Sequence, residues 1–123
     1  MPPAWLSEQS FTLQAGADGF RQVMRGKRRP TAIFCGNDLL ATGALFEAQR
    51  MGLSVPQDVS IMGVDNQEIA QAIVPTLTTI ALAMQDMGVL SAQHTIQAIH
   101  GRPVPSQSLL AHELIEREST APV

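Results

Sequence analysis

The residues best suited to chemistry in this chain are two polar pairs, Asn37–Asp38 and Asp65–Asn66, each of which directly follows an apolar run. An amide side chain donates and accepts hydrogen bonds, and a carboxylate is a strong charged acceptor for hydroxyl and N–H groups. Ligands of open parallel sheets collect at the carboxyl ends of strands, where both pairs stand. We therefore predict that Asn37 and Asp65 bind a small ligand such as a sugar, a nucleoside or a purine.

Asp38 and Asn66 have a second role open to them. A short side-chain oxygen can accept a hydrogen bond from the unpaired N–H groups of a helix start, so Asn37 or Asp38 is expected to cap the helix that follows. We interpret Asp38 and Asn66 as a cap or as residues that support the ligand contacts from behind. For a residue in the position of Asp38, capping is a more frequent role than ligand contact.

Other chemistry has little support in the sequence. His94, His100 and His112 are scattered, and no pair has the i, i+4 spacing of a zinc-binding helix. There is no phosphate-binding glycine loop, no nucleophile elbow and no tyrosine. Paired catalysis by Asp38 and Asp65 would need a perturbing environment that the sequence does not display. We predict no enzymatic activity, no metal site and no cofactor.

Composition predicts a single domain in the cytoplasm. The chain has 123 residues, and its 8 Lys and Arg against 11 Asp and Glu leave a net charge of −3, which is a poor basis for binding nucleic acid. The one cysteine, Cys35, lies in an apolar run and fits a reducing compartment. The start of the chain does not resemble a signal peptide, and no apolar run approaches the roughly 20 residues that span a bilayer, so no membrane partner is expected.

The elements that must position the polar pairs alternate along the chain. Strands are predicted at Ala4–Ser7, Ala32–Cys35, Val59–Val64 and Ser108–Glu116, and Leu77–Leu82 is interpreted as a further strand or an extended crossover. Helices are predicted from Thr12 to about Gly26 and at Asp38–Arg50, Glu68–Ile73 and Gln85–His100. The strand Ala32–Cys35 is expected to be covered on both faces, and the tail Arg117–Val123 to fray. Strand, helix, strand in this order implies parallel strands with a right-handed crossover. We predict an α/β fold, a parallel sheet flanked by helices, with both polar pairs at one sheet edge.

Two glycines weaken the first predicted helix. Gly16 and Gly19 stand inside it, and each lowers helix stability by up to about 1 kcal/mol relative to alanine.

Several motifs in order resemble the C-terminal part of LacI/GalR-family bacterial transcriptional regulators. They are RPTAIFCGND, LATGA, GLSVPQDVS, GVDN, PTLTTI and EREST, at residues 29–38, 40–44, 52–60, 63–66, 75–80 and 116–120. The resemblance implies a partial periplasmic-binding-protein-like fold, in which two α/β subdomains hold a ligand in their cleft. It implies that Asn37 and Asp65 contact the effector and that Phe11 stacks on a sugar or a base. An ordinary core role for Phe11 stays open.

The same resemblance implies a domain organisation. Residues 1–75 correspond to C-terminal subdomain elements, residues 76–107 to a crossover strand and helix normally on the N-terminal subdomain, and residues 108–123 to a return strand and tail. The family binds DNA as a dimer through an N-terminal helix-turn-helix that has no counterpart here, so DNA is expected as a partner only through such a head. We therefore expect a fragment of an effector-binding domain, with half a cleft and weak or undetectable effector binding.

The expected function is effector sensing and dimerisation within a LacI-type regulator. The alternative is the sugar-binding component of a transporter, which shares the fold. In the helix Gln85–His100 an apolar stripe would lack the sheet that the family places against it, and unpartnered apolar stripes usually form interfaces. The stripe consists of Val89, Ala92, Ile96 and Ile99. We therefore expect a homodimer.

Overall fold

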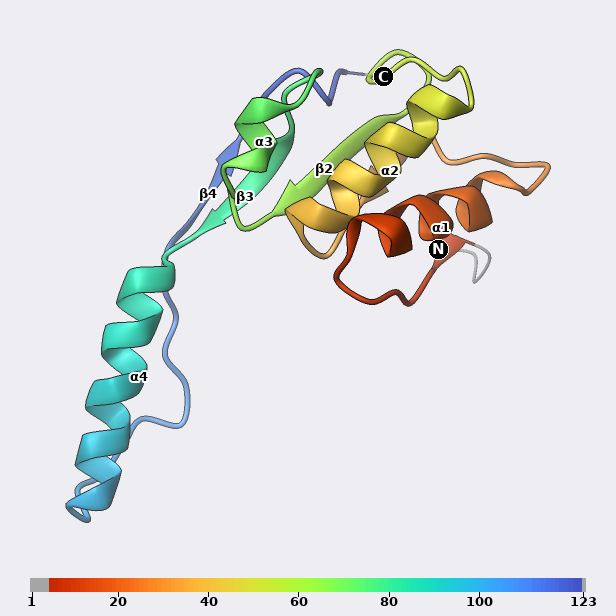
Figure 1. Cartoon of the computed structure of the whole chain (residues 1–123). Helices are drawn as coiled ribbons and strands as arrows, with labels where there is room; N and C mark the ends of the chain where they lie inside the picture. Colours follow the sequence, from red (N-terminus) through yellow and green to blue (C-terminus); the bar gives the residue numbers. More distant parts are fainter. Residues whose placement is uncertain (1–4, 123) are drawn as a thin grey trace. The chain divides into compact units, whose positions relative to one another are not determined.

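The computed structural model describes residues 5–122 and alternates strands with helices (Figure 1). The elements are α1 (Leu13–Met24), β1 (Ala32–Phe34), α2 (Asp38–Arg50), β2 (Ser60–Val64), α3 (Ile69–Ala72), β3 (Thr78–Leu82), α4 (Met84–Ile99) and β4 (His112–Ile115). The sheet has the strand order β1-β2-β3-β4, and β2 is parallel to both β1 and β3. The predicted α/β class and the parallel arrangement of these strands are confirmed.

The chain divides into two compact units. The first unit runs up to Ala81 and includes the stretch from Leu114 onward, and the second is Leu82–Glu113. The core of the first unit is made by α1, α2, α3 and one face of β2. Its largest fully buried apolar side chains are Phe20, Leu45, Val59, Ile61 and Leu77.

Helices α1 and α2 touch at backbone level because each carries a glycine at the crossing. A Cβ built on Gly16 would overlap the carbonyl group of Leu40, and one built on Gly43 would overlap the carbonyl oxygen of Leu13. Only glycine leaves room for such an approach. Gly16 therefore weakens α1 locally but permits the close contact with α2. The periodicity of α1 alone did not indicate this contact.

Both long helices of the first unit begin at side-chain caps. Thr12 Oγ1 accepts a hydrogen bond from Ala15 N at 3.1 Å, and Asn37 Oδ1 accepts one from Leu40 N at 2.9 Å. Each oxygen pairs an N–H group that the helix leaves free. The cap of α2 is thus Asn37, and the alternative that Asp38 caps it is wrong because Asp38 is already the first helical residue.

The first predicted strand does not form. Ala4 lies outside the described residues, and Trp5–Ser10 has no strand structure. Its polar side chains bond to one another and to α1 instead: Gln9 Nε2 donates to Ser7 Oγ at 2.9 Å, and Ser7 Oγ donates to Gln22 Oε1 at 3.0 Å. A strand needs a paired neighbour, and none of the backbone hydrogen bonds of the described residues joins this segment to β1. The predicted strand Ser108–Glu116 shortens to β4.

Strand β1 is less covered than its apolar sequence predicts. Ala32 and Phe34 are exposed, Phe34 by 61%, while Ile33 is partly buried. Side chains alternate along a strand, so Ala32 and Phe34 share the face opposite to Ile33, and this face is the open one. The expectation that it is covered on both faces is wrong.

The C-terminal segment is ordered and does not fray as predicted. Ser119 is fully buried, donates from Oγ to Ile61 O at 2.6 Å and accepts from Thr78 N at 2.8 Å. On either side of it, Glu118 accepts a hydrogen bond from Thr76 N at 2.8 Å and Thr120 shares one with Thr78 Oγ1 at 2.8 Å. The segment therefore joins the beginnings of β2 and β3.

The second unit consists largely of α4 and the return segment that follows it. None of the α4 residues is buried, and Val89, Ile96 and Ile99 are exposed by 53%, 56% and 75%. The apolar stripe expected on this helix is thus exposed. Among residues 5–122, no helix is long and apolar enough to cross a membrane.

Candidate functional site

The register of β1 and β2 brings the two predicted ligand residues to the same edge of the sheet. Phe34 is paired with Met62 in the parallel ladder, and Cys35 N donates to Met62 O at 2.9 Å. Asn37 and Asp65 each lie three residues beyond this paired position. Parallel neighbours keep their register to the strand ends, so both side chains stand at the carboxyl edge.

Phe11 belongs to the same corner. A Cβ built on Gly36 would stand 3.8 Å from Cε1 of the Phe11 ring, which therefore lies beside the residue before Asn37. The ring is 68% exposed, so the alternative of a core phenylalanine does not hold. An exposed aromatic face next to hydrogen-bonding groups is suited to packing on a sugar or a base.

Asn37 has one polar atom left for a ligand. Its Oδ1 is used by the cap of α2, and its Nδ2 takes part in none of the hydrogen bonds among the described residues. The residue is 8% exposed, and it contributes no buried polar atom without a partner. Its amide nitrogen therefore reaches the surface as a hydrogen-bond donor.

Asp65 and Asn66 form a turn with an uncommon backbone. Both residues have positive φ, 103° and 51°. The Asp65 carboxylate accepts only a long hydrogen bond, 3.4 Å from Gln67 Nε2, whereas Asn66 Oδ1 accepts a short one of 2.7 Å from Arg117 Nη2. Of the two side chains, Asp65 is the one left available to a ligand.

Asp38 lies behind this turn and is fully buried. Its Oδ2 accepts from Gln67 N at 2.7 Å, and its Oδ1 accepts from Thr79 Oγ1 at 2.6 Å. Gly63 makes room for the carboxylate, because a Cβ there would overlap Asp38 Oδ1. Asp38 thus binds groups on either side of it behind the turn, and its support of a ligand contact stays a prediction.

The environment of Asp38 changes its acidity. Burial raises the pKa of its carboxyl above the usual 3.8, the hydrogen bonds from Thr79 and Gln67 lower it, the charge of Asp65 raises it and that of Arg117 lowers it. The effect of burial is the largest of these, because removal from water disfavours the charged carboxylate, so the pKa of Asp38 is raised.

We expect Asp38→Asn to remove one component of the pH dependence of stability. Because the folded pKa lies above the unfolded value, the folded chain binds this proton more tightly, so its stabilising contribution is complete below pH 3.8 and lost as the pH rises through the folded pKa. Urea titrations of both proteins over a pH series give the difference in unfolding free energy, wild type minus variant. This difference should fall with rising pH and then level off; a constant difference would contradict the assignment.

Two residues of this network escaped the sequence analysis. Thr79 reads as one β-branched residue of a strand, and Arg117 lies in a segment expected to fray, although its EREST motif was among those that carried the family resemblance. Only contacts across 41 and 51 residues of sequence reveal them.

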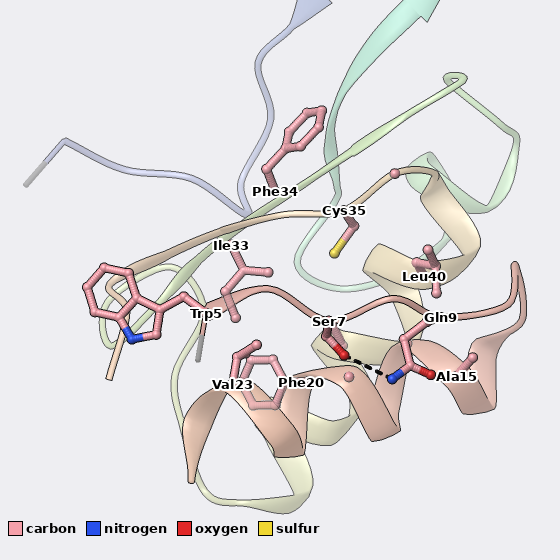
Figure 2. A pocket seen from close by; sticks show the side chains of 14 residues that line it. Trp5, Ser7, Gln9, Ala15, Phe20, Val23, Ile33, Phe34, Cys35 and Leu40 are labelled. Atoms are coloured by element: carbon pink, nitrogen blue, oxygen red, sulfur yellow. Dashed lines mark hydrogen bonds between the residues drawn. The ribbon is translucent and has the colours of Figure 1, made fainter. Parts of the chain in front are cut away.

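A cavity of about 110 Å³ lies next to the corner, between the segment Trp5–Gln9, α1 and β1. Figure 2 shows Ile33 of β1 and the following Cys35 pointing toward the side on which Ser7 and Phe20 lie, whereas Phe34 points away. Burial and, to a smaller extent, the charge of Asp38 together raise the pKa of the Cys35 thiol to about 12. The thiol is thus protonated at neutral pH and poorly nucleophilic. The described residues contain no group of His, Cys, Asp and Glu that could hold a metal ion.

Comparison with known proteins matches residues 3–120 to the family described as periplasmic binding protein-like domain. The HTH-type transcriptional repressor PurR of Salmonella arizonae is 38% identical over 122 residues, covering 98% of this chain and 36% of the relative. The chain therefore spans about a third of the length of the curated relatives it matches.

Solved structures give the same grouping. A LacI family transcriptional regulator from Mycobacterium smegmatis superposes with a TM-score of 0.86 at 32% identity, covering 98% of this chain and 46% of the other. One from Bifidobacterium animalis gives 0.83 at 32% identity, covering 93% and 42%. A third, from an Arthrobacter species in complex with lactose, gives 0.74 at 26% identity, covering 92% and 44%. Over almost its whole length, the chain belongs to the periplasmic binding protein-like domain family, in the form found in LacI-family transcriptional regulators.

Proposed function

We propose that this chain is the effector-sensing part of a LacI-type transcriptional regulator and that it binds a sugar or a purine-like molecule through Phe11, Asn37 and Asp65. The chain is proposed to act by binding and not by catalysis. In the whole regulator, an effector would favour one arrangement of the domains and so bias DNA binding, which would be performed by a part outside this chain.

The proposal rests on one observation: three side chains with different ligand-binding groups lie at one edge of the sheet. Phe11 offers an exposed aromatic face, Asn37 offers a free amide donor and Asp65 offers a nearly free carboxylate. A sugar or a purine combines an apolar face with hydroxyl or N–H groups on its rim, which matches this set. That a similar structure was solved with lactose supports the sugar class as the first to test.

The test is a titration of the ¹⁵N-labelled chain, followed by NMR, with lactose, ribose, adenine and guanosine. We expect at least one compound to shift the amide signals of residues 11, 36, 37, 65 and 66 with weak affinity, because one corner provides only part of an enclosed site. Asp65→Ala should abolish these shifts.

Glu68→Ala is the matched control, since Glu68 is an exposed carboxylate three residues further along. It should leave the titration unchanged. Shifts confined to other residues, or no shift with any of the four compounds, would count against the proposal, and micromolar affinity would contradict the expectation of half a site.

We further propose that the chain forms a homodimer through the exposed stripe of α4. Val89, Ile96 and Ile99 present apolar surface along one side of the helix, and Ala92 continues it. The opposite side, with Leu90, His94 and Gln97, is partly buried within the same unit. An exposed stripe of this kind in a charge-poor helix favours association with an identical copy.

Sedimentation equilibrium tests the dimer. The wild-type chain should sediment as a dimer at micromolar concentration, and Ile96→Glu should make it monomeric because a carboxylate would be buried in the contact. Ser91→Glu, an exposed change outside the stripe, should leave the dimer intact. A folded wild-type monomer would refute this assembly.

A further inference from the structure

The turn formed by Asp65 and Asn66 needs support from its surroundings. Two successive non-glycine residues have positive φ, and the value of 103° at Asp65 lies beyond the range of about 50° to 70° that side chains tolerate best. Such backbone persists only where neighbouring groups hold it. The groups that hold this backbone therefore also determine where the Asp65 side chain lies.

One end of the turn is held by Asp38. Its buried carboxylate accepts the hydrogen bond of Gln67 N at 2.7 Å, directly after the turn. Its other oxygen orients Thr79, whose Oγ1 accepts from Asn66 N at 3.3 Å. Two successive backbone N–H groups thus depend on one carboxylate, the first through Thr79 and the second directly.

The side chain of Asn66 is held by Arg117, which is itself fixed. Arg117 Nη2 donates to Asn66 Oδ1 at 2.7 Å, and Nη1 donates to Leu77 O at 2.7 Å. The backbone N of Arg117 donates to Thr78 Oγ1 at 2.9 Å. A planar guanidinium bound at two nitrogens has little freedom, so the position of Asn66 follows from that of β3.

These contacts avoid the Asp65 carboxylate. Its one hydrogen bond, from Gln67 Nε2, is 3.4 Å long. We propose that Asp38 and Arg117 are positioning residues that hold the Asp65–Asn66 turn and so present the nearly free Asp65 carboxylate to the effector. Asp38 acts on the two backbone N–H groups after Asp65, and Arg117 acts on the Asn66 side chain. The effector contact of Asp65 rests on the proposed function, whereas the holding of the turn does not.

The first test needs no ligand. Three-bond couplings and Cα shifts of the labelled chain report φ at Asp65 and Asn66. Arg117→Met, which keeps the apolar stem and removes the donors, and Thr79→Val, which removes the hydroxyl, should each shift these φ values toward negative angles or broaden both signals by exchange. Thr79→Ser should restore the wild-type values. Arg21→Met is the control: it removes a different arginine, which pairs with the buried carboxylate of Glu47, and it should leave the turn unchanged.

The proposal would be overturned if the turn kept its φ values in both Arg117→Met and Thr79→Val. Circular dichroism must show that each variant stays folded. Asp38→Ala is the third variant, because alanine removes both acceptor oxygens of the carboxylate. It should displace the turn, and a folded Asp38→Ala protein that keeps the wild-type φ values would refute the role given to Asp38.

A second readout separates this proposal from the proposed function. For any compound that shifts residue 65 in the wild type, Arg117→Met should raise the Kd by about tenfold, while Arg21→Met should not change it. A turn that moves in Arg117→Met without a rise in Kd would refute the presenting role. Failure of every compound to bind the wild type would count against the proposed function and leave the first test to decide the holding of the turn.

Discussion

Replacing Gly43 with alanine should destabilise the first unit by about 3 kcal/mol or more. A Cβ at this position would overlap the carbonyl oxygen of Leu13 and stand 3.1 Å from Ala17 N. Both atoms belong to the backbone of α1, so no side-chain rotation can relieve the overlap and the two helices must separate. Urea unfolding followed by the fluorescence of Trp5, the single tryptophan, measures the loss.

Gly88→Ala is the matched control. Gly88 also lies within a helix, but a Cβ there would meet nothing within 4 Å. Alanine should therefore favour α4 by about 1 kcal/mol and leave the Trp5 transition where it is. A Gly43→Ala protein as stable as the wild type would show that α1 and α2 are not packed as closely as described.

The second large effect is expected from Ser119→Ala, with a loss of about 3 kcal/mol. The buried hydroxyl serves both Ile61 O and Thr78 N, and alanine leaves the two groups without this partner. An unsatisfied buried polar group costs about 1 to 3 kcal/mol. The same urea titration measures the loss.

Ser10→Ala provides the comparison, since Ser10 is exposed and its hydroxyl makes no hydrogen bond among residues 5–122. Its transition should match the wild type within about 0.5 kcal/mol. A similarly small effect of Ser119→Ala would mean that the C-terminal segment frays, as its sequence alone suggested.

Local features determined much of this fold. Helix α2 begins and ends as its sequence predicts because its signals are its own: the side chain of Asn37 caps the first turn, and Gly52 ends the helix with a φ of 73°. The alternation of strand, helix and strand likewise sufficed to place Asn37 and Asp65 at one edge, because parallel strands in register leave no other choice.

Errors in the sequence analysis arose where a feature depends on distant partners. The segment Trp5–Ser10 has an apolar start but no paired neighbour, so it is not a strand. Ser119 looks like a residue of a polar tail until the partner 58 residues away is known. Gly16 was expected only to weaken α1, yet its lack of a Cβ lets α1 approach the backbone of α2 at Leu40.

The sequence by itself determined the fold class, the family and the candidate ligand residues, because periodicity, caps and motif order are properties of neighbouring residues. Only the tertiary structure decided the roles of Asp38 and Arg117. Asp38 meets Thr79 across 41 residues and Arg117 meets Asn66 across 51, and hydrogen bonds of such span exist only when the sheet brings their elements together. The physical reason is that a buried polar group takes its role from the partners that folding supplies.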